Sequence, residues 1–150
     1  MKLANLSLAK APYQHLMNAP VDEATDTIRA LQKKGVAVHV VRGGKSGKVA
    51  DLFCELSAAL QFPHYFGENW DAFADCLQDL AWIEQGSVVI VFTDADKLLK
   101  SAKAAEVETF KNVIADATAY WNESKKKSGK TLHVIFQSQD SDTAAKKWGV

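Results

Sequence analysis

Long apolar runs are missing from this 150-residue sequence. A membrane-spanning helix needs about 18 consecutive apolar residues, and no segment comes near that length. Polar residues also interrupt the first 17 residues before the apolar core of a signal peptide could form. We therefore expect a protein that does not enter a membrane and that stays where it is made, in the cytoplasm.

Cysteine is scarce, with only Cys54 and Cys76 in the chain. Their spacing matches neither a disulfide framework nor a metal site, and two cysteines of this kind suit a reducing compartment. Both lie in apolar helical patterns, which predict buried free thiols. The four histidines are scattered, and no pair has the spacing of zinc ligands. We expect no metal, no cofactor and no enzymatic activity.

Basic residues are absent from residues 49–96, although this window contains nine acidic ones. The chain as a whole is neutral, with 18 basic and 18 acidic residues, so the charge is distributed unevenly. An acidic segment repels phosphate backbones, which argues against direct nucleic-acid binding, and its natural complement is a basic protein surface. A solvated acidic face that only maintains solubility is the alternative.

One segment partly matches the sequence motif of a phosphate-binding loop. Gly44-Lys45-Ser46 follows a predicted strand and precedes a predicted helix, and residues 88–94 resemble the strand and acid that hold magnesium in enzymes with such a loop. The loop requires a further glycine five residues before Gly44, and His39 stands there. Without that glycine the backbone cannot curl around a phosphate, so we do not expect nucleotide hydrolysis.

Hydrophobic periodicity predicts strands that alternate with helices, and therefore an α/β fold with a small parallel sheet covered by helices. The strands are predicted over residues 36–41, 88–92 and 131–136, and the helices over residues 20–34, 49–60, 68–80 and 104–121.

The chain is predicted to form one compact unit. Residues 1–35 form an N-terminal extension with one helix, residues 36–137 form the main domain, and residues 138–150 form a C-terminal tail. Within the tail, Trp148 is expected to cover an apolar edge. On the helix of residues 104–121, Tyr120 is expected on the buried face.

Residues 68–80 form the most informative predicted helix. A step of about 100° per residue separates its side chains into two opposite stripes. One stripe is apolar, as in any helix that packs on a core, and the other is acidic. The apolar stripe contains Trp70, Phe73, Cys76, Leu77 and Leu80, and the opposite stripe contains Asp71, Asp75, Gln78 and Asp79.

The acidic stripe costs stability. Asp71, Asp75 and Asp79 are like charges four residues apart, and each such pair destabilises a helix by about 0.2–0.5 kcal/mol. The helix dipole favours Asp71 near the start of the helix, but it does not favour the other two acids. Carboxylates on a rigid helix beside Tyr65 look like a preformed mimic of a nucleic-acid backbone. A pair of metal-binding carboxylates is the alternative, although nothing else in the sequence completes a metal shell.

The same segment resembles a known family. It reads Tyr65-Phe66-Gly67-Glu68-Asn69-Trp70-Asp71-Ala72-Phe73, followed by Asp75-Cys76-Leu77, and this pattern resembles the barstar family of intracellular ribonuclease inhibitors. The resemblance extends more loosely over residues 36–136. It implies a three-stranded parallel sheet packed with helices, to which this chain adds an N-terminal helical extension.

The resemblance also implies a binding site. The acid that matches Asp75 enters the active site of a ribonuclease in place of a substrate phosphate, and Asp71, Tyr65 and Asn69 match residues that flank it. Asp79, one turn further on, is expected at the rim. Helix alignment matches Asp116 to another contributing acid, whereas the namesake of the family has a tryptophan at the position of Ala74. The predicted partner-binding residues are Tyr65, Asn69, Asp71, Ala74, Asp75, Gln78 and Asp116.

The expected partner is a basic ribonuclease, either barnase-like or a toxin against which the chain acts as an immunity protein. We expect a monomer in the free state and no direct contact with nucleic acid. The alternative is a barstar-like module that binds another basic protein without inhibiting a ribonuclease.

Overall fold

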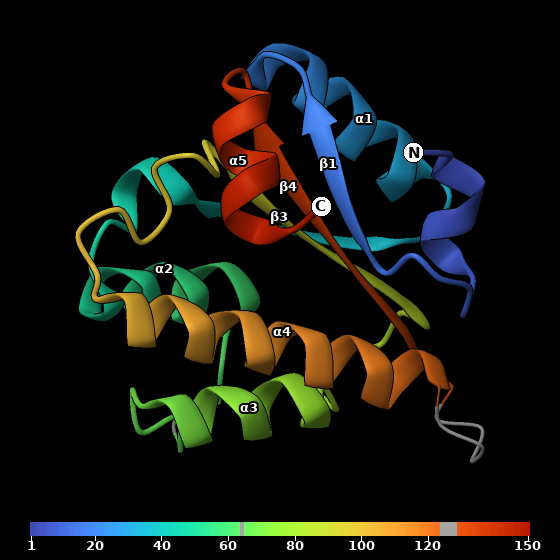
Figure 1. Cartoon of the computed structure of the whole chain (residues 1–150). Helices are drawn as coiled ribbons and strands as arrows, with labels where there is room; N and C mark the ends of the chain where they lie inside the picture. The colour runs from blue at the N-terminus through green and yellow to red at the C-terminus, as the bar shows by residue number, and fades with distance from the viewer. Residues whose placement is uncertain (64, 124–128) are drawn as a thin grey trace.

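The computed structural model describes residues 1–63, 65–123 and 129–150. Its centre is a four-stranded sheet with helices on both faces (Figure 1). The strands lie in the order β1-β4-β3-β2, and each neighbouring pair is parallel, as the alternation of strands and helices predicted. The strands are β1 (Gln14–Asn18), β2 (Ala37–Arg42), β3 (Ser87–Thr93) and β4 (Thr131–Ser138).

The first strand was not predicted, so the expectation of a three-stranded sheet is wrong. β1 pairs with β4 in a register that places Gln14 opposite Val134. The strand is short and partly polar, and its partner lies 120 positions later in the chain, so no local pattern indicates the pairing. The N-terminal residues, expected to form an extension with one helix, therefore also supply one edge of the sheet.

The helices form two unequal layers (Figure 1). One face of the sheet packs on α1 (Val21–Lys33) and on a short 3-10 turn, η1 (Leu3–Ser7). The other face packs on α2 (Val49–Leu60), α4 (Ala104–Glu123) and α5 (Ser141–Trp148), and α3 (Trp70–Asp79) lies outside α2 and α4. All four helices expected from periodicity are present, with ends within two residues of the prediction.

The sheet separates two cores, as the side chains of the inner strand β3 show. Val89 and Val91 belong to the core beneath α1, whereas Ile90 and Phe92 belong to the core beneath α2 and α4. Successive side chains of a strand point to opposite faces, and both faces are covered. For this reason β3 reads in the sequence as one uninterrupted apolar run.

The C-terminal segment, expected to be a tail, folds as helix α5. The Asp140 side chain caps its start by accepting a hydrogen bond from the Thr143 N–H, and Gly149 ends it with a φ of +71°. Trp148 is 3% exposed and stacks on Phe136 of β4, with ring centroids 5.2 Å apart. The indole thus covers an apolar part of the core.

The two cysteines differ in environment. Cys76 is buried in α3, whereas Cys54 on α2 is exposed, so the expectation of two buried thiols is wrong for Cys54. The helical step accounts for this, because it places Cys54 about 160° from the centre of the stripe formed by Leu52 and Leu60. None of the helices in the described part of the chain is long and apolar enough to cross a membrane.

Candidate protein-binding surface

The acidic helix α3 is held on the outside of the molecule by aromatic packing. Phe73 is fully buried and stacks on Phe110 of α4 at a centroid distance of 6.3 Å. Trp70 meets Phe53 of α2 edge-on at 5.0 Å. Aromatic pairs at such distances add about 0.5–1.5 kcal/mol each to the burial of their surface. These contacts fix the inner stripe of α3, and hence the direction of its outer stripe.

Asn69 sets where α3 begins. Its side-chain oxygen accepts a hydrogen bond from the Ala72 N–H at 2.8 Å, and its amide nitrogen donates to the Gly67 oxygen at 3.3 Å. Glu68 has a left-handed φ of +51°, so it lies outside the helix that was expected to include it. The structure therefore gives Asn69 a capping role, and its contact with a partner stays a prediction.

The three acids of the outer stripe are all exposed. Asp71 lies in the first turn of α3, Asp75 lies one turn later, and Asp79 is the last residue of the helix. Ala74 and Gln78, the other predicted site residues on this helix, are partly exposed. The spacing predicted from the sequence is therefore realised as one carboxylate per helical turn.

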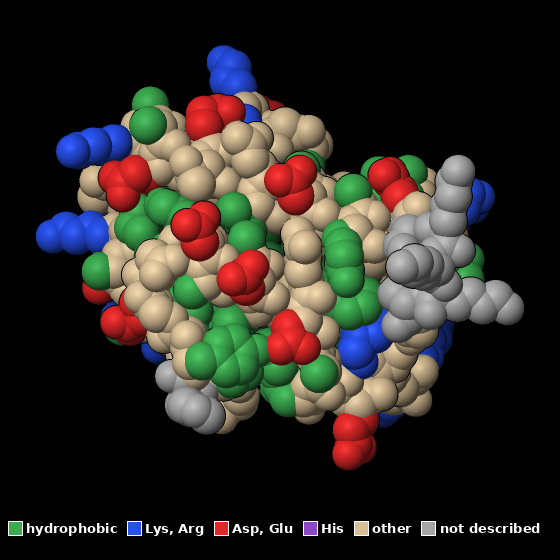
Figure 2. Space-filling view, turned by 90° about the horizontal axis from the view of Figure 1, so that it is seen from below, with side chains coloured by type: hydrophobic (Ala, Val, Ile, Leu, Met, Phe, Trp, Pro, Cys, Tyr) green, Lys and Arg blue, Asp and Glu red, His purple; other side chains and the backbone are tan. Residues whose placement is uncertain are grey.

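The space-filling view shows the setting of this helix. On the face that contains α3 and α4, acidic side chains lie among apolar groups, and most lysine and arginine side chains lie toward the margins (Figure 2). Such a surface, with apolar contact area between charges of one sign, suits a protein partner of the opposite charge.

Tyr65 is joined to the acidic stripe. Its hydroxyl donates a hydrogen bond to Oδ2 of Asp79 at 2.5 Å, and its side chain is 54% exposed. The hydrogen bond to Asp79 raises the pKa of Tyr65 to about 12, with smaller contributions from burial and from the charge of Asp79. Sequence reasoning placed Tyr65 at the site but missed the bond, because the two residues are 14 positions apart.

Helix α4 adds two exposed residues. Asp116, predicted at the site, is exposed, and so is Tyr120 one turn later, at 47%. The expectation that Tyr120 is buried is wrong. It lies about 80° around the helix from Phe110, at the edge of the apolar stripe, and Trp121 takes the buried position. The i, i+4 spacing from Asp116 was the signal that could have identified Tyr120 as a surface aromatic.

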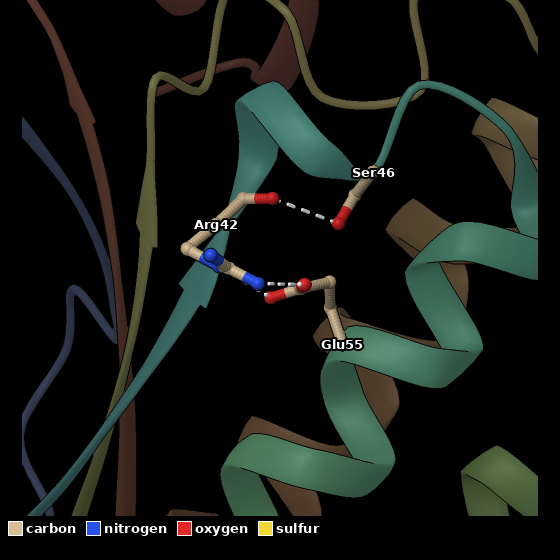
Figure 3. Close-up of polar contacts among 3 residues, drawn as sticks. All are labelled: Arg42, Ser46 and Glu55. Atoms are coloured by element: carbon tan, nitrogen blue, oxygen red, sulfur yellow. Dashed lines mark hydrogen bonds and ion pairs between the residues drawn. The ribbon is translucent and has the colours of Figure 1, made fainter.

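The segment around Gly44-Lys45-Ser46, which partly matches a phosphate-binding loop, has a structural role in this protein (Figure 3). Ser46 is fully buried, and its hydroxyl donates to the Arg42 main-chain oxygen at 2.9 Å. The Arg42 guanidinium makes two hydrogen bonds to Glu55 of α2, at 2.6 and 3.0 Å. These bonds hold the pKa of Glu55 below its ordinary value. The segment therefore connects the end of β2 to α2.

Metal binding has no visible basis on the acidic helix. Within the described ranges, no three histidine, cysteine, aspartate or glutamate side chains are grouped so that they could hold a metal ion. Ca²⁺ and Mg²⁺ need more ligands than a pair of neighbouring carboxylates supplies, and among the described residues no third such side chain joins a pair on this helix. The arrangement offers negative charge to an extended partner surface.

Together, the parallel sheet and its outer acidic helix define a small α/β protein with an acidic surface suited to protein binding. A family model described as Barstar (barnase inhibitor) matches residues 36–137. The chain belongs to the barstar family. A search of curated proteins found no match.

Two of the solved structures that are similar to this chain have low sequence identity to it. Cdc6p from Pyrobaculum aerophilum matches with a TM-score of 0.51 and 18% identity, over 91% of this chain and 37% of that one. A chain in the structure of Drosophila ORC bound to AT-rich DNA and Cdc6 has a TM-score of 0.49 and 14% identity, over 90% of this chain and 42% of that one. This chain spans less than half the length of both.

Proposed function

We propose that this protein inhibits a basic, barnase-like ribonuclease by inserting the outer face of α3 into its active site. The observation that carries the proposal is the exposed carboxylate of Asp75, placed mid-helix with an exposed acid one turn to either side. The family membership supports it, because the family description names a barnase inhibitor.

The chemistry of the target explains why a carboxylate inhibits it. A ribonuclease active site holds a phosphate with several cationic donors, and a carboxylate oxygen accepts the same charge-assisted hydrogen bonds. Asp75 would occupy the phosphate position, with Asp71 on one side and Asp116 on the neighbouring helix. Because no reactive bond is presented to the enzyme, the complex leads to no turnover.

Rigidity contributes to the affinity. Binding costs less when the interacting groups already hold their bound arrangement. The caps and packing of α3 fix its acids before any partner arrives, and the like-charge repulsion along the stripe is relieved when cations enter between them. In this role the protein protects a cell from its own ribonuclease or from that of a neighbour.

The decisive measurement is the inhibition of one cognate ribonuclease by the parent and by Asp75→Ala. Removing one partner of a buried interfacial charge pair costs about 2–5 kcal/mol. Complexes of the barstar family are among the examples from which this range comes. We expect the inhibition constant to rise by roughly 30- to 5,000-fold for Asp75→Ala, and by less for Asp71→Ala, Asp116→Ala and Tyr65→Phe.

The matched control is Asp26→Ala, which removes an exposed acid from α1 on the other side of the sheet. We expect it to inhibit like the parent. If folded Asp75→Ala also inhibits like the parent, the phosphate-mimic mechanism is wrong for this protein. Co-expression with a toxic ribonuclease gives the same comparison in cells, as growth rescue.

A second function is a module that binds another basic protein without inhibiting a ribonuclease. Ala74, directly before Asp75, is the feature that favours it, because the namesake of the family has a large aromatic side chain there. A stable complex with a ribonuclease that brings neither inhibition nor rescue would support this second function.

A further inference from the structure

Asp79 stands at an unfavourable place for a carboxylate. It is the last residue of α3, where the negative end of the helix dipole repels an anion. Its two oxygen atoms are nevertheless both engaged. Oδ2 accepts the Tyr65 hydroxyl at 2.5 Å, and Oδ1 accepts the Ala81 N–H at 3.3 Å. The carboxylate is thus oriented by the chain that follows the helix, and it orients the tyrosine in turn.

The bond to Asp79 changes what Tyr65 can offer a partner. A phenolic hydroxyl has one hydrogen to donate, and otherwise its oxygen only accepts. The hydrogen of Tyr65 already points to Asp79, so toward the outside its oxygen can only accept. The bond also keeps the ring, which is 54% exposed, in one orientation. A free tyrosine would meet donors and acceptors equally well.

We propose that Asp79 is a positioning residue that turns Tyr65 into a fixed hydrogen-bond acceptor, so that this end of the surface selects partners presenting a cationic or N–H donor. The inference rests on the proposed function and names the chemistry required of the ribonuclease at this point. Arginine and lysine have only donors to present, whereas an acidic or acceptor-rich surface would face the Tyr65 oxygen without a hydrogen bond.

The neighbouring groups agree with this assignment. The carboxylates of Asp71 and Asp75 accept hydrogen bonds and donate none. Together with the Tyr65 oxygen, they form a surface that binds hydrogen-bond donors. A tyrosine hydroxyl is protonated at neutral pH even at its ordinary pKa of 10, so Asp79 retains its donor, and the raised pKa of Tyr65 is a consequence of that bond. Asp79 acts on the partner through Tyr65, whereas the sequence predicted it only at the rim.

The first test needs no partner. Ultraviolet titration of the free protein reports the ionisation of its three tyrosines, and the difference between the parent and Tyr65→Phe isolates that of Tyr65. We expect Asp79→Asn to move this component from about pH 12 toward the ordinary pKa of 10. A Tyr65 component that Asp79→Asn leaves unchanged would overturn the assignment.

The second test is a double-mutant cycle with barnase as the probe. Dissociation constants are measured for the parent, Asp79→Ala, Tyr65→Phe and the double variant, at a salt concentration high enough to screen long-range charge. We expect Asp79→Ala to weaken binding by about tenfold in the parent and by less than about twofold when Tyr65 is already phenylalanine. Asp79→Leu, which likewise has no acceptor for the Tyr65 hydroxyl, replaces Asp79→Ala in the cycle if the latter does not fold.

Glu84→Ala is the matched control, because it removes an exposed acid of the same base-free window that lies beyond α3. We expect the same small effect in both backgrounds. If Asp79→Ala behaves in the same way, Asp79 contributes only charge and the inference is wrong, while the proposed function stands. If the parent does not bind barnase or any other basic ribonuclease, both fail together.

Discussion

The indole Nε1 of Trp121 on α4 donates a hydrogen bond to the main-chain oxygen of Leu77 on α3, 2.6 Å away. Leu77 lies in the last turn of its helix, where main-chain oxygens have no partner within the helix. Trp121 supplies that partner from a neighbouring helix. The bond therefore completes the end of α3 and attaches the acidic helix to the rest of the molecule.

Replacing Trp121 with phenylalanine should destabilise the protein. The substitution leaves the Leu77 oxygen without this buried donor, which costs about 1–3 kcal/mol. Urea unfolding at neutral pH measures the difference. Tyr120→Phe, at the exposed neighbouring position, is the control and should stay within about 0.5 kcal/mol of the parent. Equal midpoints for both variants would mean that the bond contributes nothing.

Removing the acids of the outer stripe should leave the fold intact. Asp71 and Asp75 are exposed, and the double variant Asp71→Ala with Asp75→Ala relieves like-charge repulsion while it loses one favourable contact with the helix dipole. We expect stability within about 0.5 kcal/mol of the parent, or slightly above it. A loss of more than about 2 kcal/mol in urea would show that these acids are structural.

Gly43 is expected to tolerate no side chain. A Cβ at this position would lie 2.2 Å from the Thr93 main-chain oxygen and 2.8 Å from that of Asp94, so the backbone would have to move. Gly43→Ala should lower stability by about 1–3 kcal/mol. Gly44→Ala is the control, since its added Cβ would come no closer than 3.5 Å to a side-chain oxygen. A thermal melt that ranks the two variants in the opposite order contradicts the expectation.

Acid should weaken the attachment of β1. His133 Nε2 donates to the Leu8 oxygen at 2.8 Å, so its Nδ1 accepts from His15 Nε2 at 3.0 Å. Burial lowers the pKa of His15 to about 4, helped by the charges of His133 and the N-terminus, and burial lowers the pKa of His133 as well. Both rings are therefore neutral in the folded protein at neutral pH.

The sign of the pH effect follows from these shifts. A histidine with a lowered folded pKa binds protons better when unfolded, so its contribution is complete above pH 6.5 and is lost as the pH falls toward 4. At about 1.4 kcal/mol per pKa unit, the His15 shift corresponds to a loss on the order of 3 kcal/mol. Urea melts from pH 7 to about pH 4.5 should show a shallower decline for His15→Gln than for the parent. Parallel declines would contradict this.

Association with a basic partner should depend strongly on salt. The window of residues 49–96 has nine acids and no base, and complexes of the barstar family are themselves a standard example of electrostatic steering. We expect the association rate constant to fall by at least about tenfold once the Debye length drops below about 10 Å. Stopped-flow mixing over a salt series measures it, and a rate independent of salt would remove charge as the cause.

The sequence by itself determined the features that repeat within one element. The two stripes of α3, the apolar run of β3 and the helix ends were predicted because side-chain direction repeats every 3.6 residues in a helix and every two in a strand. The barstar motif also lies within a single stretch of chain. Helical periodicity is therefore enough to place its acids on one exposed face, and the folded protein has them there.

Only the tertiary structure decided the features that join distant segments. The strand β1, which was not predicted, depends on a partner 120 residues away, and the bond between Tyr65 and Asp79 spans a helix. Tyr120 stands at the edge of its apolar stripe, so its exposure depends on what packs beside it. Periodicity describes one element at a time, whereas pairing, hydrogen bonds between side chains and burial at the edge of a stripe depend on which elements become neighbours.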